Sequence, residues 1–183
     1  VASLRAIPNL NVFRPADAIE TAECWVIAIE SAATPSVIVL TRQGLATVRT
    51  DHTDENLSAK GGYILANADG ERKATILATG SEVEIALAAR DTLQADGVPT
   101  AVVSLPSWNL FDAQDQKYRD DVFGSGVRVA IEAAVSMGWE KYIGSEGAFI
   151  GMSSFGASAP AGELYNHFGI TADAAVAAVK ERL

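Results

Sequence analysis

Arg42 is the residue of this 183-residue chain best placed to bind a charged small molecule. It follows the segment Ser36–Leu40, whose continuous β-branched character predicts a strand buried on both faces. Sheets of the α/β class bind ligands at the carboxyl ends of parallel strands. A guanidinium offers a planar fork of donors that matches a phosphate or carboxylate. The sequence therefore suggests an anion site at Arg42, with a surface or ion-pairing arginine as the alternative.

Gly80 and Ser81 mark a second and weaker candidate. They lie between the predicted strand Ala74–Ala78 and a predicted helix, where free amide groups could bind an anion or another small ligand. The sequence lacks the further glycines of a dinucleotide fingerprint and the lysine of a phosphate loop, and Glu82 and Glu84 would repel a phosphate. Helix capping by a capping box of Ser81 and Glu84 is the favoured interpretation, and a small-ligand site is the alternative.

The other reactive side chains form no recognisable site. His52 lies in a polar acidic stretch, and His167 lies near the end of a predicted short helix, where a cation would favour the helix dipole. Cys24 stands in mid-helix beside Trp25, which is typical of an unactivated thiol. One cysteine and two scattered histidines predict neither a disulfide nor a metal site, and the sequence shows no catalytic triad.

Apolar segments alternate with segments of helical period, which predicts an α/β fold with a mostly parallel sheet. The first unit consists of a strand at Asn11–Phe13, a helix from about Ala16 to Ser31 and the strand Ser36–Leu40. This helix has one apolar face, formed by Ile19, Ala22, Val26 and Ile29. We therefore expect a β-α-β unit at the start of the chain.

A polar stretch from Thr41 to about Lys60 predicts a linker and a domain boundary. Beyond it, Gly61–Leu65 and Ala74–Ala78 flank a turn at Asn67–Gly70 and together predict a β-hairpin. The later segments predict, in order, a helix from Ser81, strands at Thr100–Leu105 and Val127–Ile131, a loop over Gly144–Ala161, and helices at Gly162–Phe168 and after Thr171.

The charge balance excludes one class of partner. The chain has 14 Lys and Arg against 23 Asp and Glu, a net charge of −9, whereas nucleic-acid binding depends on clustered basic residues. Its longest run of Val, Ile and Leu is Val37–Leu40, far below the roughly 18–20 residues of a membrane helix. The single cysteine and the absence of a signal-peptide pattern favour a cytoplasmic protein, and the start at Val1 favours a fragment or a processed product.

Six blocks in order show that the chain closely resembles the carboxyl-terminal part of transketolases, from Arg5 to Leu183. The blocks are Ile7–Asp17, Leu40–Gln43, Gly61–Leu65, Ala78–Val83, Val102–Pro106 and Phe155–Ala161.

The resemblance implies a fold and a division of the chain. Residues 1–50 would be the end of a thiamine diphosphate pyrimidine-binding domain, with a partial βαβ unit, and residues 51–60 a linker. Residues 61–183 would form the carboxyl-terminal domain, a Rossmann-like three-layer α/β domain with a mostly parallel sheet.

The resemblance also implies a function. Transketolases are cytoplasmic homodimeric transferases of the pentose phosphate pathway that move a two-carbon ketol unit between ketose and aldose phosphates. They use thiamine diphosphate and Mg²⁺ or Ca²⁺, whose ligands would lie outside this chain. The isolated chain is therefore expected to be inactive and to contain no catalytic, cofactor-binding or metal-binding residue.

One substrate residue carries over, namely Arg42, which the resemblance implies is a sugar-phosphate ligand. The block departs from the family pattern at two positions, with Thr41 in place of Ser and Gly44 in place of Asn, and Gly44 loosens the backbone just after the arginine. Two alternatives are a non-catalytic α/β assembly or small-ligand-binding module and the corresponding part of a related thiamine diphosphate enzyme.

Overall fold

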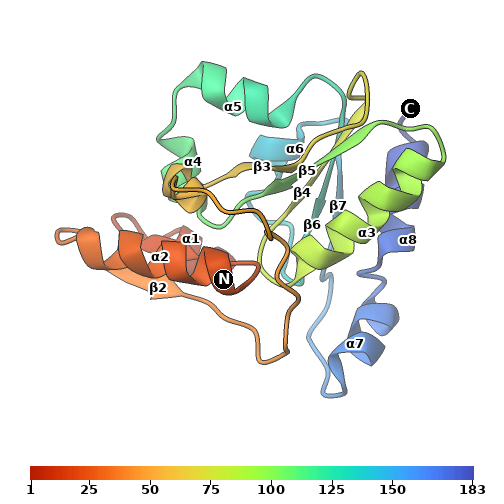
Figure 1. Ribbon diagram of the computed structural model, residues 1–183. Coiled ribbons are helices and arrows are strands. Elements are labelled where there is room, and N and C mark those ends of the chain that lie inside the picture. The colour runs from red at the N-terminus through yellow and green to blue at the C-terminus, as the bar shows by residue number, and fades with distance from the viewer.

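The computed structural model describes residues 1–183 and contains a two-stranded sheet and a five-stranded sheet (Figure 1). In chain order the elements are α1 (Ala2–Arg5), β1 (Asn11–Phe13), α2 (Ala18–Glu30), β2 (Ser36–Ile38), the 3-10 helix η1 (Leu57–Lys60), β3 (Tyr63–Ala66), β4 (Ala74–Ala78), α3 (Glu82–Ala95), β5 (Thr100–Ser104), α4 (Trp108–Asp112), α5 (Gln116–Phe123), β6 (Val127–Ile131), α6 (Glu140–Ile143), β7 (Ala148–Ile150), α7 (Ala161–Phe168) and α8 (Ala172–Lys180).

The first unit is the predicted β-α-β arrangement. Strands β1 and β2 pair in parallel, with Asn11 opposite Ser36, and α2 connects them. Asp17 caps α2 by accepting a hydrogen bond from the amide of Glu20 at 2.8 Å. Strand β2 ends two residues earlier than predicted, because its partner β1 ends at Phe13. Beyond β2, the amide of Val39 still donates to the carbonyl of Phe13.

The apolar face predicted for α2 lies largely in solvent. Ile19, Val26 and Ile29 are 42%, 49% and 74% exposed, whereas Glu20 and Cys24 on another side of the helix are fully buried. The helix therefore contacts the rest of this chain through its more polar side.

The five-stranded sheet has the order β3-β5-β4-β6-β7, in which only β3 runs antiparallel to its neighbour. The predicted hairpin of β3 and β4 is therefore wrong, because β5 lies between them. Every residue of β4 is buried, as expected of a strand with a neighbour on each side. Strand β3 is only half-buried over Ile64–Ala66, as expected of a strand at the edge of the sheet. The connection Asn67–Lys73 is long enough to pass across β5.

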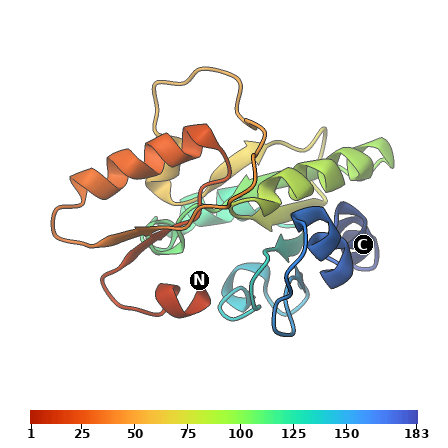
Figure 2. The same ribbon diagram turned by 90° about the horizontal axis from the view of Figure 1, so that it is seen from below.

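Helices cover both faces of this sheet and make three layers (Figures 1 and 2). On one face, Ile76, Val102 and Ile131 pack against α3 and α8. On the other face, Leu77, Val103 and Ala130 join a cluster of aromatic residues from α4 to α6. The alternation along each strand follows from the two-residue period of β-structure.

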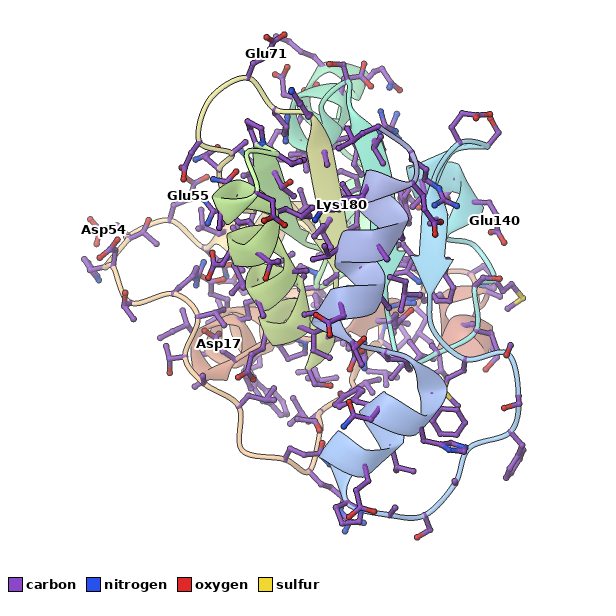
Figure 3. The ribbon with its side chains drawn as sticks, turned by 90° about the vertical axis from the view of Figure 1, so that its right-hand side faces the viewer. Asp17, Asp54, Glu55, Glu71, Glu140 and Lys180 are labelled. Atoms are coloured by element: carbon purple, nitrogen blue, oxygen red, sulfur yellow. The ribbon has the colours of Figure 1, made fainter.

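The two helices of the first layer are also linked at their surface. The ammonium of Lys180 on α8 donates to the carboxylate of Asp96 after α3 at 2.7 Å, and Figure 3 shows these helices side by side. No helix combines the length and apolar character that a membrane crossing requires.

Two local predictions need correction. The hydroxyl of Ser81 bonds the neighbouring carboxylate of Glu82 rather than an amide of α3, so no capping box forms. The predicted loop Gly144–Ala161 contains the short edge strand β7, which has no alternating pattern because all three of its residues are half-buried. The helix after Thr171 is confirmed, and the hydroxyl of Thr171 accepts from the amide of Ala174.

Candidate functional site

Arg42 lies in the irregular segment that follows β2. Its side chain is exposed, and its guanidinium has neither a hydrogen-bond partner nor an ion-pair partner within the chain. The hydroxyl of Thr41 bonds the side-chain amide oxygen of Gln43, and the amide of Gln43 donates back to that hydroxyl at 3.3 Å. These bonds hold the turn that presents Arg42 beyond the carboxyl end of a parallel strand.

The structure brings this turn beside Gly80 and Ser81. Together with Arg14, Leu40 and Thr41, they line a cavity of about 100 Å³. Gly80 has a φ of +61°, and its amide donates to the carbonyl of Arg14 at 2.9 Å, so the protein itself uses one of the amides proposed for ligand binding. The two sequence-predicted sites are therefore neighbours, and ligand binding at Gly80 and Ser81 stays a prediction.

A second cavity adjoins the same turn. Gln43 lines this apolar cavity of about 270 Å³ together with Met152, Tyr165 and Phe168. These three residues belong to the region around α7, so the turn lies close to the carboxyl-terminal part of the molecule.

Buried ion pairs connect the start of the chain to the five-stranded sheet. Nη1 of Arg14 lies 2.5 Å from Oε2 of Glu82 and 3.4 Å from Oε1 of Glu132, and it also donates to the carbonyl of Thr79 at 2.8 Å. Arg5 binds Glu132 through two hydrogen bonds of 2.8 and 2.9 Å. Both carboxylates are fully buried, and none of these ion pairs was predicted from the sequence.

Further donors complete the network. The indole of Trp139 donates to Glu132 at 2.8 Å, and the amide of Ala133 donates to Glu82 at 3.0 Å. The hydroxyl of Tyr165 on α7 donates to the other oxygen of Glu82 at 2.7 Å. Because buried carboxylates need several partners, this arrangement holds α7, α3 and the segment after β1 in one geometry.

The attraction between the charges of Arg14 and Glu82 sets the protonation of both side chains. Burial opposes the charge on both side chains, but the nearby opposite charge outweighs it, so the pKa of Arg14 is raised and the pKa of Glu82 is lowered. Burial, followed by the charge of Glu82, raises the pKa of Tyr165 to about 12. Arg14 and Glu82 are therefore both charged and mutually neutralised, and neither is free for a ligand.

Arg42 has no carboxylate partner, unlike three buried arginines of the chain. Arg5 and Arg14 pair with Glu132 and Glu82, and Arg49 pairs with Glu23 at 2.6 Å. The sequence does carry a signal for the two acids, although not for their partners. Glu132 directly follows the apolar strand Val127–Ile131, and Glu82 follows the short turn after the apolar strand Ala74–Ala78, where a buried acid needs a cation.

The histidines and the cysteine lie where the structural interpretation places them. His52 is exposed and lies 3.0 Å from Asp54, and the exposed ring of His167 packs edge-on against Phe168. Cys24 is buried, and burial is the main cause that raises the pKa of its thiol. None of them is a candidate nucleophile or base.

No group of three or more His, Cys, Asp or Glu side chains in the structure could hold a metal ion. Anion binding at Arg42 stays a prediction.

Two family models match the chain. Residues 1–47 match the family model described as "Transketolase, pyrimidine binding domain", and residues 61–171 match "Transketolase-like TK C-terminal domain". The transketolase of Sinorhizobium medicae is 59% identical over the whole chain, which spans 26% of that relative's length.

Solved structures show the same similarity. A transketolase from Leishmania mexicana has a TM-score of 0.89 and 40% identity over 99% of this chain and 26% of its own. A Pichia stipitis transketolase, described as a complex with sedoheptulose-7-phosphate, has a TM-score of 0.89 and 35% identity with the same coverage.

Proposed function

The chain belongs to the transketolase family, and we propose that it serves as the carboxyl-terminal part of a transketolase. In this proposal, residues 1–50 complete a pyrimidine-binding domain, residues 51–60 are a linker, and residues 61–183 are the carboxyl-terminal domain. The gap between the two matched regions and the separation of the two sheets support these boundaries.

The parent enzyme would transfer a two-carbon ketol unit between ketose and aldose phosphates, as in the pentose phosphate pathway. Thiamine diphosphate and Mg²⁺ or Ca²⁺ would be bound by parts of the parent outside this chain, which spans 26% of the length of a transketolase relative. This chain would supply substrate binding, and on its own it would have no activity.

Arg42 is the residue that we propose binds the sugar phosphate. The observation that carries this proposal is its unpaired, exposed guanidinium beyond the end of β2, among arginines that are already paired with buried carboxylates. A phosphate would accept two parallel charge-assisted hydrogen bonds from such a fork. The similar Pichia stipitis enzyme is described with a sugar phosphate bound, which agrees with this class of substrate.

A homodimer in the cytoplasm is part of the same proposal. The exposed apolar side chains of α2, which include Trp25, form a surface that a second protein surface would cover. The single, buried cysteine suits a reducing compartment.

A coupled assay tests the proposed function. The purified chain and its full-length parent are each supplied with thiamine diphosphate, Mg²⁺, a ketose phosphate and an aldose phosphate. We expect turnover by the parent and none by the chain. Turnover by a chain preparation that mass spectrometry shows to be free of the parent, or an inactive parent, would contradict the proposal.

A further inference from the structure

Glu20 is a fully buried carboxyl group at the contact between the β1-α2-β2 unit and the five-stranded sheet. Its Oε2 accepts from the amide of Ala16 at 2.6 Å. Its Oε1 accepts from the hydroxyl of Tyr63 on β3 at 2.7 Å and lies 2.6 Å from the hydroxyl of Ser104 on β5. One side chain thus connects α2 to two adjacent strands of the other sheet.

Glu20 has no cation as a partner, unlike the buried Glu82 and Glu132. Arg49 follows β2 and is the cation of this region, but it pairs with Glu23 and lies over the ring of Tyr63 at 5.4 Å. The side chain of Glu23 is further satisfied by the amide and hydroxyl of Ser58 on η1.

The other titratable neighbours make a negative charge on Glu20 still less favourable. Asp17 lies one helical turn before it, and its carboxylate is held by the amides of Glu20 and Val48. Figure 3 shows Asp17 at the start of α2. Cys24 lies one turn after Glu20 and is buried beside it. An anion at Glu20 would therefore be surrounded by two acids, a thiol and hydroxyl groups.

We propose that Glu20 is a neutral carboxylic acid in the folded protein at neutral pH and that its proton forms a pH-sensitive contact between the two sheets. With the proton on Oε1, that oxygen donates to one of the hydroxyls of Tyr63 and Ser104 and accepts from the other, since each hydroxyl can do both. Oε2 then remains the acceptor for the amide of Ala16. The contact then contains no buried charge, and the hydroxyl that accepts from Oε1 is left without an acceptor for its own hydrogen.

Burial is the main cause that raises the pKa of Glu20 above its ordinary value of 4.5, and Asp17 acts in the same direction against the hydrogen bonds that lower it. A raised pKa in the folded state means that this group favours folding most at low pH. That contribution is lost as the pH rises through the folded pKa. Alkaline pH should therefore loosen the contact between the two sheets.

Infrared spectroscopy of the 183-residue chain tests the proton directly. At pH 7 we expect the C=O stretching band of a protonated carboxyl group in the wild type and in Glu30→Gln, which makes the same change at an exposed position of α2. The band should be absent in Glu20→Gln. Absence of the band from the wild type, or its persistence in Glu20→Gln, would overturn the proposal.

Two further measurements keep the proposal testable. If Glu20→Gln fails to fold, the ¹³C resonance of the Glu20 carboxyl carbon in the wild type should report a neutral acid at pH 7 and titrate above it. Titration of that carbon below pH 7 would overturn the proposal. If Glu20→Gln folds, its Tm minus that of Glu30→Gln should increase between pH 6 and pH 9, and a constant difference would count against the contact.

Discussion

Arg14 and Glu82 form a buried ion pair of 2.5 Å that joins the residue after β1 to the first turn of α3. The pair links the segments that carry the two sheets, and Arg14 also lines the small cavity beside Thr41. It therefore connects the two parts of the chain close to the turn that carries Arg42.

Removing the cation of this pair should strongly destabilise the chain. Arg14→Met leaves Glu82 buried without its main counter-charge, and breaking a buried pair in this way costs about 3–5 kcal/mol. Urea unfolding measures the loss. The control is Lys117→Met on α5, whose pair with Asp121 is exposed and should contribute nothing measurable. Equal stability of the two variants would contradict the structural role of Arg14.

Glu82 should make stability depend on pH in the acid range. Burial opposes its ionisation, but Arg14 outweighs burial and the pKa of Glu82 falls below its ordinary value of 4.5. A lowered pKa contributes stability above the unfolded pKa, and this contribution is lost as the pH falls through the folded pKa. The difference in unfolding free energy between the wild type and Glu82→Gln should thus be largest at neutral pH and shrink below about pH 4.5.

Glu84 lies two residues further along α3, on the opposite, exposed side of the helix, and provides the control. Glu84→Gln should leave the pH profile of the wild type unchanged. A difference between the wild type and Glu82→Gln that stays constant from pH 7 to pH 3 would show that Glu82 is not the anion of the pair.

Most of the fold was predictable because the pattern of apolar residues has a clear period. Asn11–Phe13 and Val127–Ile131 are strands with the predicted limits, since each is bounded by residues that stop a strand. The position of β3 was not predictable. Tyr63 pairs with Ser104 because β5 has a free side for an edge strand, and a local turn signal does not indicate which strand has such a free side.

Gly80→Ala should cost more stability than Gly97→Ala. Both glycines have positive φ, +61° and +77°, which costs a residue with a Cβ about 1 kcal/mol or more. A Cβ at Gly97 meets open space, whereas a Cβ at Gly80 would lie 2.8–2.9 Å from side-chain atoms of Arg14 and displace the ion pair. Thermal unfolding of both variants measures the difference, and a smaller loss at Gly80 would argue against this packing.

The site was only partly predictable for a physical reason. Arg42 is recognisable because a strand end and an arginine adjoin in the sequence, and the resemblance supplies its role. The pairs of Arg5 with Glu132 and of Arg14 with Glu82 join residues 127 and 68 positions apart. Their partners are chosen by the packing of the two sheets, which no local pattern of the sequence encodes.

The most direct test of the proposed function is substrate use by the full-length parent with Arg42→Ala. Loss of two charge-assisted hydrogen bonds should raise KM for phosphorylated donors about tenfold or more, since each such bond is worth roughly 1.5–3 kcal/mol. KM for an unphosphorylated ketose donor should stay the same. Arg42→Lys should recover part of the loss, because an ammonium replaces a fork.

The matched control is Arg182→Ala, which removes an exposed arginine from the end of the chain, at the opposite side of the molecule from the segment after β2 (Figure 1). This variant should use both donors as the wild type does. We expect a KM increase for phosphorylated donors that is confined to the Arg42 variants. Unchanged KM values in Arg42→Ala, or an equal increase for phosphorylated and unphosphorylated donors, would contradict the proposed role of Arg42.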